Sequence, residues 1–187
     1  MIGAAFRALP VMAALAGGIG GDGLASSMTA DRALHPHWVE LQWPFPVDQW
    51  GTGRAFQCVA DACGVTVNLY LRPKIGFCNC AKGVYDDAEL DRVGDVALIG
   101  PQYAGIAEGR EVTVGWMKGR SRAFTVSGPY QPPGAAAVIA FNDKCDVVVA
   151  TVTSEADLSR GADQALQFLN TDLVLRWARA ELGSNGS

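Results

Sequence analysis

The sequence predicts an α+β fold, in which an antiparallel β-sheet built from hairpins packs against a long amphipathic C-terminal helix. Two patterns predict this fold. Three pairs of short apolar runs are separated by turn-forming residues, and apolar side chains recur at helical spacing in residues 159–182. The chain has 187 residues, of which 49% are hydrophobic. This size and composition fit a single domain with a substantial core, which we expect to span residues 31–187.

The first thirty residues differ in composition from the rest of the chain. Arg7 is the only charged residue before Asp22, residues 8–19 form an apolar run, and small residues follow at 23–25. A short positive region, an apolar region and a small-residue site together indicate a secretory signal. We therefore expect residues 1–30 to be a signal peptide, with a flexible N-terminal segment as the alternative. The apolar run is too short for a spanning helix of ~20 residues, so no stable membrane insertion is expected once this segment is cleaved.

Three short segments are expected to form the first strands of the sheet. Residues 38–43 alternate roughly as a strand does, and the proline at position 44 ends the pattern. Residues 56–59 form a second strand. Residues 65–71 form a third, in which every second side chain is apolar. The five residues between the second and third strands include aspartate and glycine, so these two strands are expected to form a hairpin.

A short helix is expected at residues 86–93. Asp86 is a suitable N-cap, and Glu89 follows three residues later, as in a capping box. Gly94 is expected to end the helix.

Two more hairpins are expected in the second half of the chain. Residues 111–117 and 122–126 are expected to pair around the turn sequence KGRS. The segment GPYQPPGA then forms an extended proline-rich link. Residues 136–141 and 146–152 are expected to pair around NDKC, and because both strands are almost entirely apolar they are expected to be central, with both faces covered.

The longest helix is expected at residues 159–182, ended by Gly183. Its apolar stripe consists of Ala162, Leu166, Leu169, Leu173, Trp177 and Ala180. This order of elements, over roughly residues 38–182, resembles that of PsbP-like domains, which have an antiparallel sheet flanked by helices. The resemblance implies an exported or lumenal accessory protein rather than an enzyme. No sequence motif carries it, and it assigns no functional residue.

The first two of the five cysteines flank the expected turn of the first hairpin. A disulfide between Cys58 and Cys63 is within reach if the two positions face each other, and in an oxidising compartment this pairing is the simplest interpretation. The loop that it closes is small, so its contribution to stability is modest. The full set is Cys58, Cys63, Cys78, Cys80 and Cys145.

The remaining cysteines leave several pairings open. A disulfide between Cys78 and Cys80 would be a small strained ring, of the kind that is easily reduced and tends to be labile or catalytic. Alternatively, each bonds elsewhere, for example to Cys58 or Cys63. Because five is odd, full oxidation leaves at least one thiol free or bonded to another molecule. Cys145 lies in an expected turn and is predicted to be that thiol.

The same cysteines allow a metal site or redox chemistry as alternatives to structural disulfides. Cys58 and Cys63 would form one knuckle and Cys78 and Cys80 the other, and four thiolates suit zinc or copper(I). The spacing differs from the usual two-residue knuckle. Apart from zinc or copper at such a site, no cofactor is expected. A His-x-His pair near the N-terminus is a further candidate for copper or nickel, formed by His35 and His37.

Charge and motifs give no support to nucleic-acid binding, to ordinary hydrolase activity or to nucleotide binding. The net charge is −4 and charges of both signs are interspersed, which gives no electrostatic support for nucleic-acid binding. No Gly-x-Ser-x-Gly or Walker pattern is present. A capped, solvated helix explains the acidic cluster Asp86, Asp87, Glu89, Asp91 and Asp95 better than calcium binding does. The basic residues Lys118, Arg120 and Arg122 are expected at a hairpin tip, either solvated or facing an acidic partner.

These observations support two functional hypotheses. In the first, the protein is periplasmic or secreted and non-enzymatic, and it acts as an accessory or binding factor. Its disulfides fix the first hairpin, and its partner is another protein. In the second, it is a thiol-based redox protein or a copper- or zinc-handling protein that uses Cys58, Cys63, Cys78 and Cys80.

Overall fold

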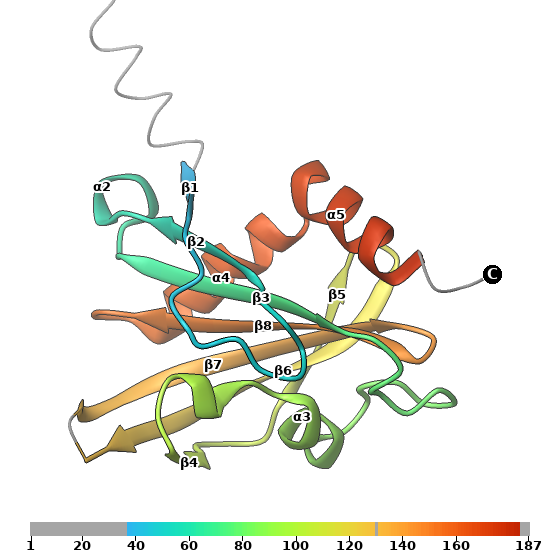
Figure 1. Cartoon of the computed structure of the whole chain (residues 1–187). Coiled ribbons are helices and arrows are strands. Elements are labelled where there is room, and N and C mark those ends of the chain that lie inside the picture. The colour runs from blue at the N-terminus through green and yellow to red at the C-terminus, as the bar shows by residue number, and fades with distance from the viewer. Residues whose placement is uncertain (1–36, 130, 184–187) are drawn as a thin grey trace, which may run out of the picture.

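The β-strands form one antiparallel sheet in the order β1-β2-β3-β8-β7-β6-β4, with β5 pairing with β6 beside β4 (Figure 1). This computed structural model describes residues 37–129 and 131–183. Within them the sheet has eight strands. Their bounds are β1 Trp38–Leu41, β2 Arg54–Cys58, β3 Val67–Lys74, β4 Gln102–Gly105, β5 Arg110–Val114, β6 Met117–Gly128, β7 Gln131–Asp143 and β8 Asp146–Ser154.

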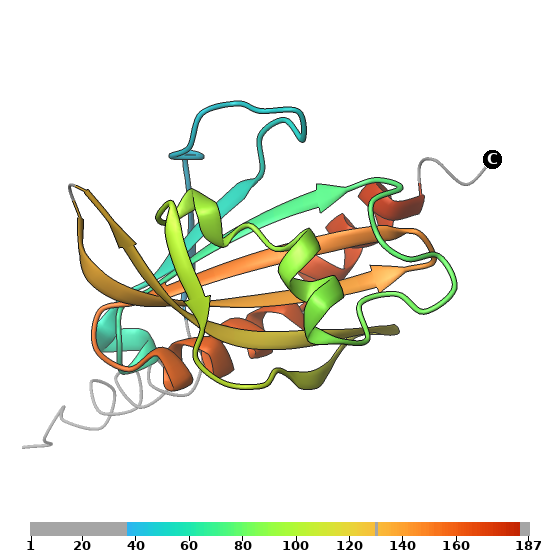
Figure 2. The ribbon, with the colours of Figure 1, turned by 90° about the horizontal axis from the view of Figure 1, so that it is seen from below.

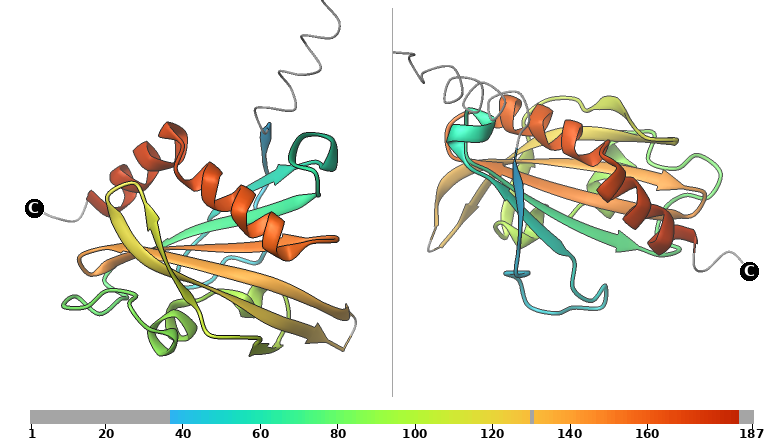
Figure 3. Two further views of the ribbon diagram at one scale, coloured as in Figure 1. Left: turned by 180° about the vertical axis from the view of Figure 1, so that it is seen from behind. Right: turned by 90° about the horizontal axis from the view of Figure 1, so that it is seen from above.

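Helices cover both faces of the sheet. The two C-terminal helices pack on one face, which we call the α4 face (Figure 3). The short helices between β3 and β4 lie on the other, which we call the α3 face (Figure 2). The bounds of the helices are α2 Ala60–Cys63, α3 Asp87–Val93, η1 (a 3₁₀ turn) Val96–Leu98, α4 Leu158–Leu169 and α5 Asp172–Gly183. The predicted α+β class, with an antiparallel sheet and a C-terminal helical layer, is confirmed.

Two hydrophobic cores result, one under each helical layer. Because side chains alternate along β3, they point in turn to the α4 face and to the α3 face. Val67, Leu69 and Leu71 are fully buried on the α4 face, whereas Arg72 and Lys74 point to the α3 face. The strands β7 and β8 contribute to both cores, which confirms that they are central and covered on both faces.

Two of the three predicted hairpins have the expected turns. Strands β2 and β3 pair antiparallel, and the turn between them contains the single-turn helix α2. Strands β7 and β8 pair up to Asp143 and Asp146, and Lys144 in their turn has a positive φ of 54°. The predicted N-terminal strand is also present as the edge strand β1, paired with β2.

The second hairpin turns earlier than predicted. Val114 pairs with Met117, so the turn is Gly115–Trp116, and residues 118–121, which were predicted as the turn, lie inside β6. Gly115 has φ 58°, a left-handed conformation that glycine adopts without strain. The proline-rich segment is likewise not a separate link, because β6 pairs with β7 up to Gly128 and Gln131. Gly128 belongs to β6, and residues 131–135 belong to β7.

The predicted C-terminal helix is two helices, broken at Asn170. The Asn170 side-chain amide donates to the Thr113 carbonyl at 3.3 Å, and its oxygen accepts from the Gly115 N–H at 2.9 Å. These bonds hold the helix end against the β5–β6 turn, and the break shifts the buried stripe of α5. Leu173 is 46% exposed, whereas Val174 is fully buried, together with Ala178 and Leu182.

Helix α3 agrees with its prediction. The Asp86 carboxylate accepts from the Glu89 backbone N–H at 2.7 Å, as the capping residue of this helix. At the other end, the Gly94 N–H donates to the Leu90 carbonyl. The capped helix packs Leu90 and Val93 into the core of the α3 face.

Candidate functional site

The first disulfide joins Cys58 to Cys63, as the sequence predicts. Cys58 ends β2 and Cys63 ends α2, and their Cα atoms are 6.0 Å apart. Both residues are buried in the core of the α4 face. The bond closes the turn of the first hairpin over a sequence separation of five residues.

The second disulfide joins Cys80 to Cys145, and it corrects the prediction that Cys145 is the free thiol. It ties the segment after β3 to the β7–β8 turn, across a sequence separation of 65 residues. The pairing is decided by tertiary contact, because the Cys78 N–H donates to the Cys145 carbonyl at 3.0 Å and so draws the two segments together. Among the described residues, the free cysteine is Cys78.

The Cys78 thiol is buried and of low reactivity. Its Sγ lies 3.2 Å from the Lys144 carbonyl oxygen, and its side chain belongs to the core of the α3 face. Burial, with a smaller contribution from the carboxylates of Glu89 and Asp146, raises the pKa of this thiol from 9.0 to about 11. The nucleophilic thiolate is therefore disfavoured at neutral pH.

The four-cysteine metal site is not assembled. Cys58 and Cys63 are bonded to each other on the α4 face, whereas Cys78 lies in the core of the α3 face and Cys80 is bonded to Cys145. Residues 37–129 and 131–183 contain no group of three or more His, Cys, Asp or Glu side chains placed to hold a metal ion.

The predicted His-x-His pair is only partly within the structure. His37 is the first described residue and is exposed, whereas His35 lies outside the described residues. A copper or nickel site at this pair therefore stays a prediction.

The predicted acidic cluster and the predicted basic residues meet each other. Asp87 of α3 forms an ion pair with Arg120 of β6 and accepts from the Gly109 N–H at 3.0 Å. Asp91, one helical turn later, pairs with Arg122 at 2.7 Å. The Arg120 hydrogen bond, with help from Gly109, holds the pKa of the Asp87 carboxyl below its ordinary value. These charges thus dock α3 on β6.

A buried ion cluster lies where β3 meets the start of η1. The Arg72 guanidinium binds the carboxylates of both Asp95 and Asp48, and Lys74 lies 2.8 Å from Asp95. Desolvation lowers the pKa of Lys74, and the attraction of Asp95 only partly opposes it. Arg72 and Lys74 stand two residues apart in a strand, and this spacing signals that both point to one face.

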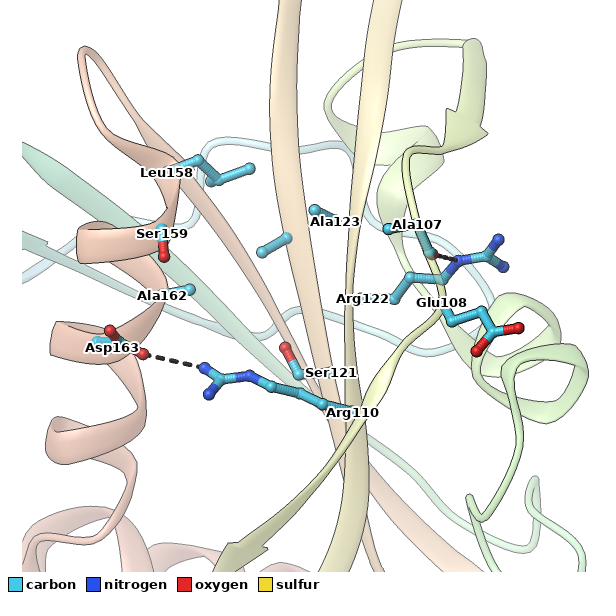
Figure 4. A pocket seen from close by; sticks show the side chains of 11 residues that line it. Ala107, Glu108, Arg110, Ser121, Arg122, Ala123, Leu158, Ser159, Ala162 and Asp163 are labelled. Carbon is cyan, nitrogen blue, oxygen red and sulfur yellow. Dashed lines mark hydrogen bonds and ion pairs between the residues drawn. The ribbon is translucent and has the colours of Figure 1, made fainter.

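A cleft of about 360 Å³ opens on the α4 face, between the first turns of α4 and strand β6 (Figure 4). The volume is within the ~300–1,000 Å³ typical of small-molecule sites. Most of the side chains that line it are small. They include Ala107, Ser121, Ala123, Ala137, Ser159 and Ala162.

An ion pair crosses one end of this cleft. The Arg110 guanidinium of β5 lies 2.9 Å from the Asp163 carboxylate of α4, and both side chains are more than half exposed (Figure 4). The other basic side chain at the cleft, Arg122, donates to the Ala107 carbonyl and reaches away from the cleft towards Asp91. Sequence reasoning missed this site, because alanine and serine carry no distinctive pattern in a linear sequence.

Comparison with known proteins assigns no family. No protein-family model matches the chain, and a search of curated proteins finds no match. None of the helices in the described parts of the chain is long and apolar enough to cross a membrane. The candidate sites therefore stand on the chemistry of the residues themselves.

Proposed function

We propose that the protein is an exported, non-enzymatic accessory protein that binds another protein in the periplasm or outside the cell. The observation that carries this proposal is the pair of disulfides, because such bonds persist in oxidising compartments and are rare in the cytosol. Cys80 is exposed, so cytosolic reductants would have access to its bond. The signal-like N-terminal composition and the resemblance in element order to PsbP-like domains support the same proposal.

A protein partner is favoured by the apolar side chains along the β1 edge. Val39 and Leu41 are 50% and 42% exposed, and Val47 in the following loop is 71% exposed. Strand β1 ends the sheet, and within the described residues no strand pairs with its outer edge. An extended segment of a partner protein would fit here by adding a strand to the sheet.

Export is tested by expressing the chain from its own start codon in a Gram-negative host and separating the periplasm from the cytosol. The expected result is a shortened protein in the periplasm whose intact mass increases by about four hydrogen masses on reduction, two for each disulfide. A full-length protein found in the cytosol with five free thiols would contradict the proposal.

The partner surface is tested with a double variant and a matched control. The variant Val39→Glu with Leu41→Glu places two carboxylates on the β1 edge, whereas Ile106→Glu places one at an aliphatic residue of similar exposure, 55%, which follows β4 at the other end of the sheet. Chemical crosslinking in intact cells should yield a discrete crosslinked species with the native protein and with Ile106→Glu. The β1 double variant should lose it. Equal crosslinking of all three proteins would refute the assignment of this edge.

Thiol redox chemistry is the second candidate function. It is favoured by the arrangement of Cys78 beside the Cys80–Cys145 bond, and opposed by the raised pKa of Cys78. An assay of insulin reduction in the presence of a thiol reductant tests it. Turnover that is lost in Cys80→Ser, and retained in Cys63→Ser, would favour the redox function over the accessory function.

Copper or zinc handling is tested separately. Native mass spectrometry of the reduced and the oxidised protein, titrated with Zn²⁺ or Cu(I), would reveal stoichiometric binding. If the reduced protein binds one metal ion tightly through its cysteines, metal handling is favoured over the accessory function. If neither form binds stoichiometrically, metal handling is excluded.

A further inference from the structure

The cleft between α4 and β6 exists because small side chains face each other across it. Ala123 of β6 and Ala137 of β7 are directly paired in the sheet, and Ala162 of α4 lies opposite them. Larger aliphatic residues at these positions would fill the space and continue the core. The alanines thus leave a hollow with apolar walls at the rim of the α4-face core, which Ala137 and Ala162 both join.

The side chain of Ser121 contributes a polar group to this hollow. Ser121 is 6% exposed, and its hydroxyl points into the cleft between β6 and α4 (Figure 4). Within residues 37–129 and 131–183 this hydroxyl has no hydrogen bond to another residue, and its oxygen is open to the cleft rather than sealed in the core. A ligand in the cleft can therefore take the place of solvent as its hydrogen-bond partner. The Ser159 hydroxyl of α4 also lines the cleft, so the surface is apolar apart from these two hydroxyls and the charged residues at its ends.

Three of the four charged side chains around the cleft are in ion pairs. Arg110 and Asp163 pair with each other across one end, and Arg122 binds Asp91 on the α3 face. Glu108 lines the rim, but its carboxylate points away from the hollow (Figure 4). An ionic ligand would have to displace one of these pairs, whereas a neutral ligand leaves them in place and gains from burying apolar surface.

We propose that this cleft binds a neutral, largely apolar small molecule carrying one hydroxyl or carbonyl group, which hydrogen-bonds to the Ser121 hydroxyl. A cavity of about 150 Å³ lined by aliphatic and aromatic side chains holds benzene. The cleft here, at about 360 Å³, accommodates a molecule with roughly twice as many carbon atoms. This site is independent of the β1 edge and of the proposed protein partner.

The probe for this site is 2-naphthol, compared with naphthalene and naphthalene-2-sulfonate, with binding followed by two-dimensional NMR of the isotope-labelled protein. We expect saturable shifts of the Ser121, Ala123 and Ala162 amide signals with 2-naphthol. Naphthalene should bind more weakly, and the sulfonate should bind weakest because it is charged.

Three variants test whether the ligand contacts Ser121 and occupies the cleft. Ser121→Ala should weaken 2-naphthol binding about five-fold, the effect of one hydrogen bond, and leave naphthalene binding unchanged. Ala123→Phe fills the cleft and should abolish binding. Lys118→Phe, on the same strand and the opposite face, is the control and should bind normally.

Ser159→Phe fills the cleft from α4 instead, and replaces Ala123→Phe if that variant does not fold. Three results would each overturn the proposal: no saturable shift at the cleft residues, sulfonate binding as tight as that of naphthol, or unchanged naphthol binding in a folded variant whose cleft is filled.

Discussion

Arg72 and Asp95 form a two-bond ion pair inside the protein. The Arg72 Nε and Nη2 atoms donate to the two carboxylate oxygens at 3.0 and 2.6 Å, and the side chains are only 2% and 8% exposed. Arg72 belongs to β3, whereas Asp95 precedes η1, so the pair fastens the helical layer of the α3 face to the sheet. Asp48 extends the cluster to the β1–β2 connection. Removing Arg72 would leave the two carboxylates of Asp95 and Asp48 with only the Lys74 ammonium beside Asp95.

The substitution Arg72→Met is therefore expected to lower the free energy of unfolding by about 3–5 kcal/mol, the usual range for breaking a buried pair. Lys74 remains beside Asp95 and keeps the loss within this range. The matched control is Arg110→Met, whose ion pair with Asp163 is exposed and should contribute less than about 1 kcal/mol. Urea unfolding, followed by tryptophan fluorescence, measures the free energy of unfolding of both variants. Equal losses in the free energy of unfolding would show that the buried Arg72 pair contributes no more to stability than the exposed Arg110 pair.

The two disulfides are expected to differ in their contribution to stability. A disulfide restricts the unfolded chain more when it closes a longer loop, so loss of Cys80–Cys145 should cost about 4 kcal/mol and loss of Cys58–Cys63 about 2 kcal/mol. The measurement compares urea unfolding of Cys80→Ser/Cys145→Ser with that of Cys58→Ser/Cys63→Ser. Both double variants also carry Cys78→Ser, which prevents disulfide exchange. A larger loss for the short loop would contradict the entropic argument.

The Cys78 thiol is expected to react slowly. Its pKa is raised from 9.0 to about 11, so at pH 8 the folded protein has about a hundredfold less thiolate at this site than the unfolded chain. Alkylation by iodoacetamide, followed by intact mass, should be at least about a hundredfold slower than in urea and should accelerate as the pH rises towards 11. The Cys78→Ser protein, which should not react, is the control. Fast labelling of the folded protein at neutral pH would contradict the buried thiol.

The same pKa shift predicts how stability depends on alkaline pH. The fold favours the protonated thiol, so its contribution is fully present below the ordinary pKa of 9.0 and is lost as the pH rises towards about 11. Cys78→Ser should show a shallower loss of stability over this interval, because serine does not ionise there. Parallel stability curves for the two proteins from pH 8 to about 11 would argue against this linkage.

Acid is expected to weaken the contact between α3 and β6. The pKa of Asp87 is held below its ordinary value of 3.8, chiefly by Arg120, so its contribution is present above that pH and is lost as the pH falls through the folded-state pKa. Asp87→Asn should be less stable than the native protein at pH 7, and its stability should fall less steeply below about pH 4. Urea unfolding at a series of pH values measures this. Asp163→Asn, which removes a carboxylate from an exposed ion pair, is the control and should change the stability at pH 7 by less than about 1 kcal/mol.

The Asn170 side chain is expected to set the break between α4 and α5. Asn170→Ala removes its bonds to Thr113 and Gly115 and should lower the free energy of unfolding by about 1–2 kcal/mol, although alanine is the better helix former. Thr113→Ala keeps the backbone carbonyl that Asn170 contacts, and so serves as a control near zero. A stabilised Asn170→Ala protein would show that helix propensity outweighs these bonds.

Patterns within a single element determined much of the fold from the sequence. The alternation in Val67, Leu69 and Leu71 assigned β3 and its buried face, and Asp86 with Glu89 assigned the start of α3. The pairing of Cys58 with Cys63 was also foreseeable, since only one turn separates them. These features depend on residues a few positions apart, whose backbone geometry is set by local sterics and hydrogen bonds.

Other features were decided by residues far apart in the sequence. Cys145 pairs with Cys80 because the β7–β8 turn packs on the segment after β3, a contact across 65 residues. The helix break at Asn170 depends on acceptors and donors in the β5–β6 turn, and the acidic face of α3 is neutralised by arginines of β6. The cleft around Ser121 arises from alanines on two strands and a helix. Such contacts form only when the sheet brings these segments together, so no local pattern in the sequence encodes them.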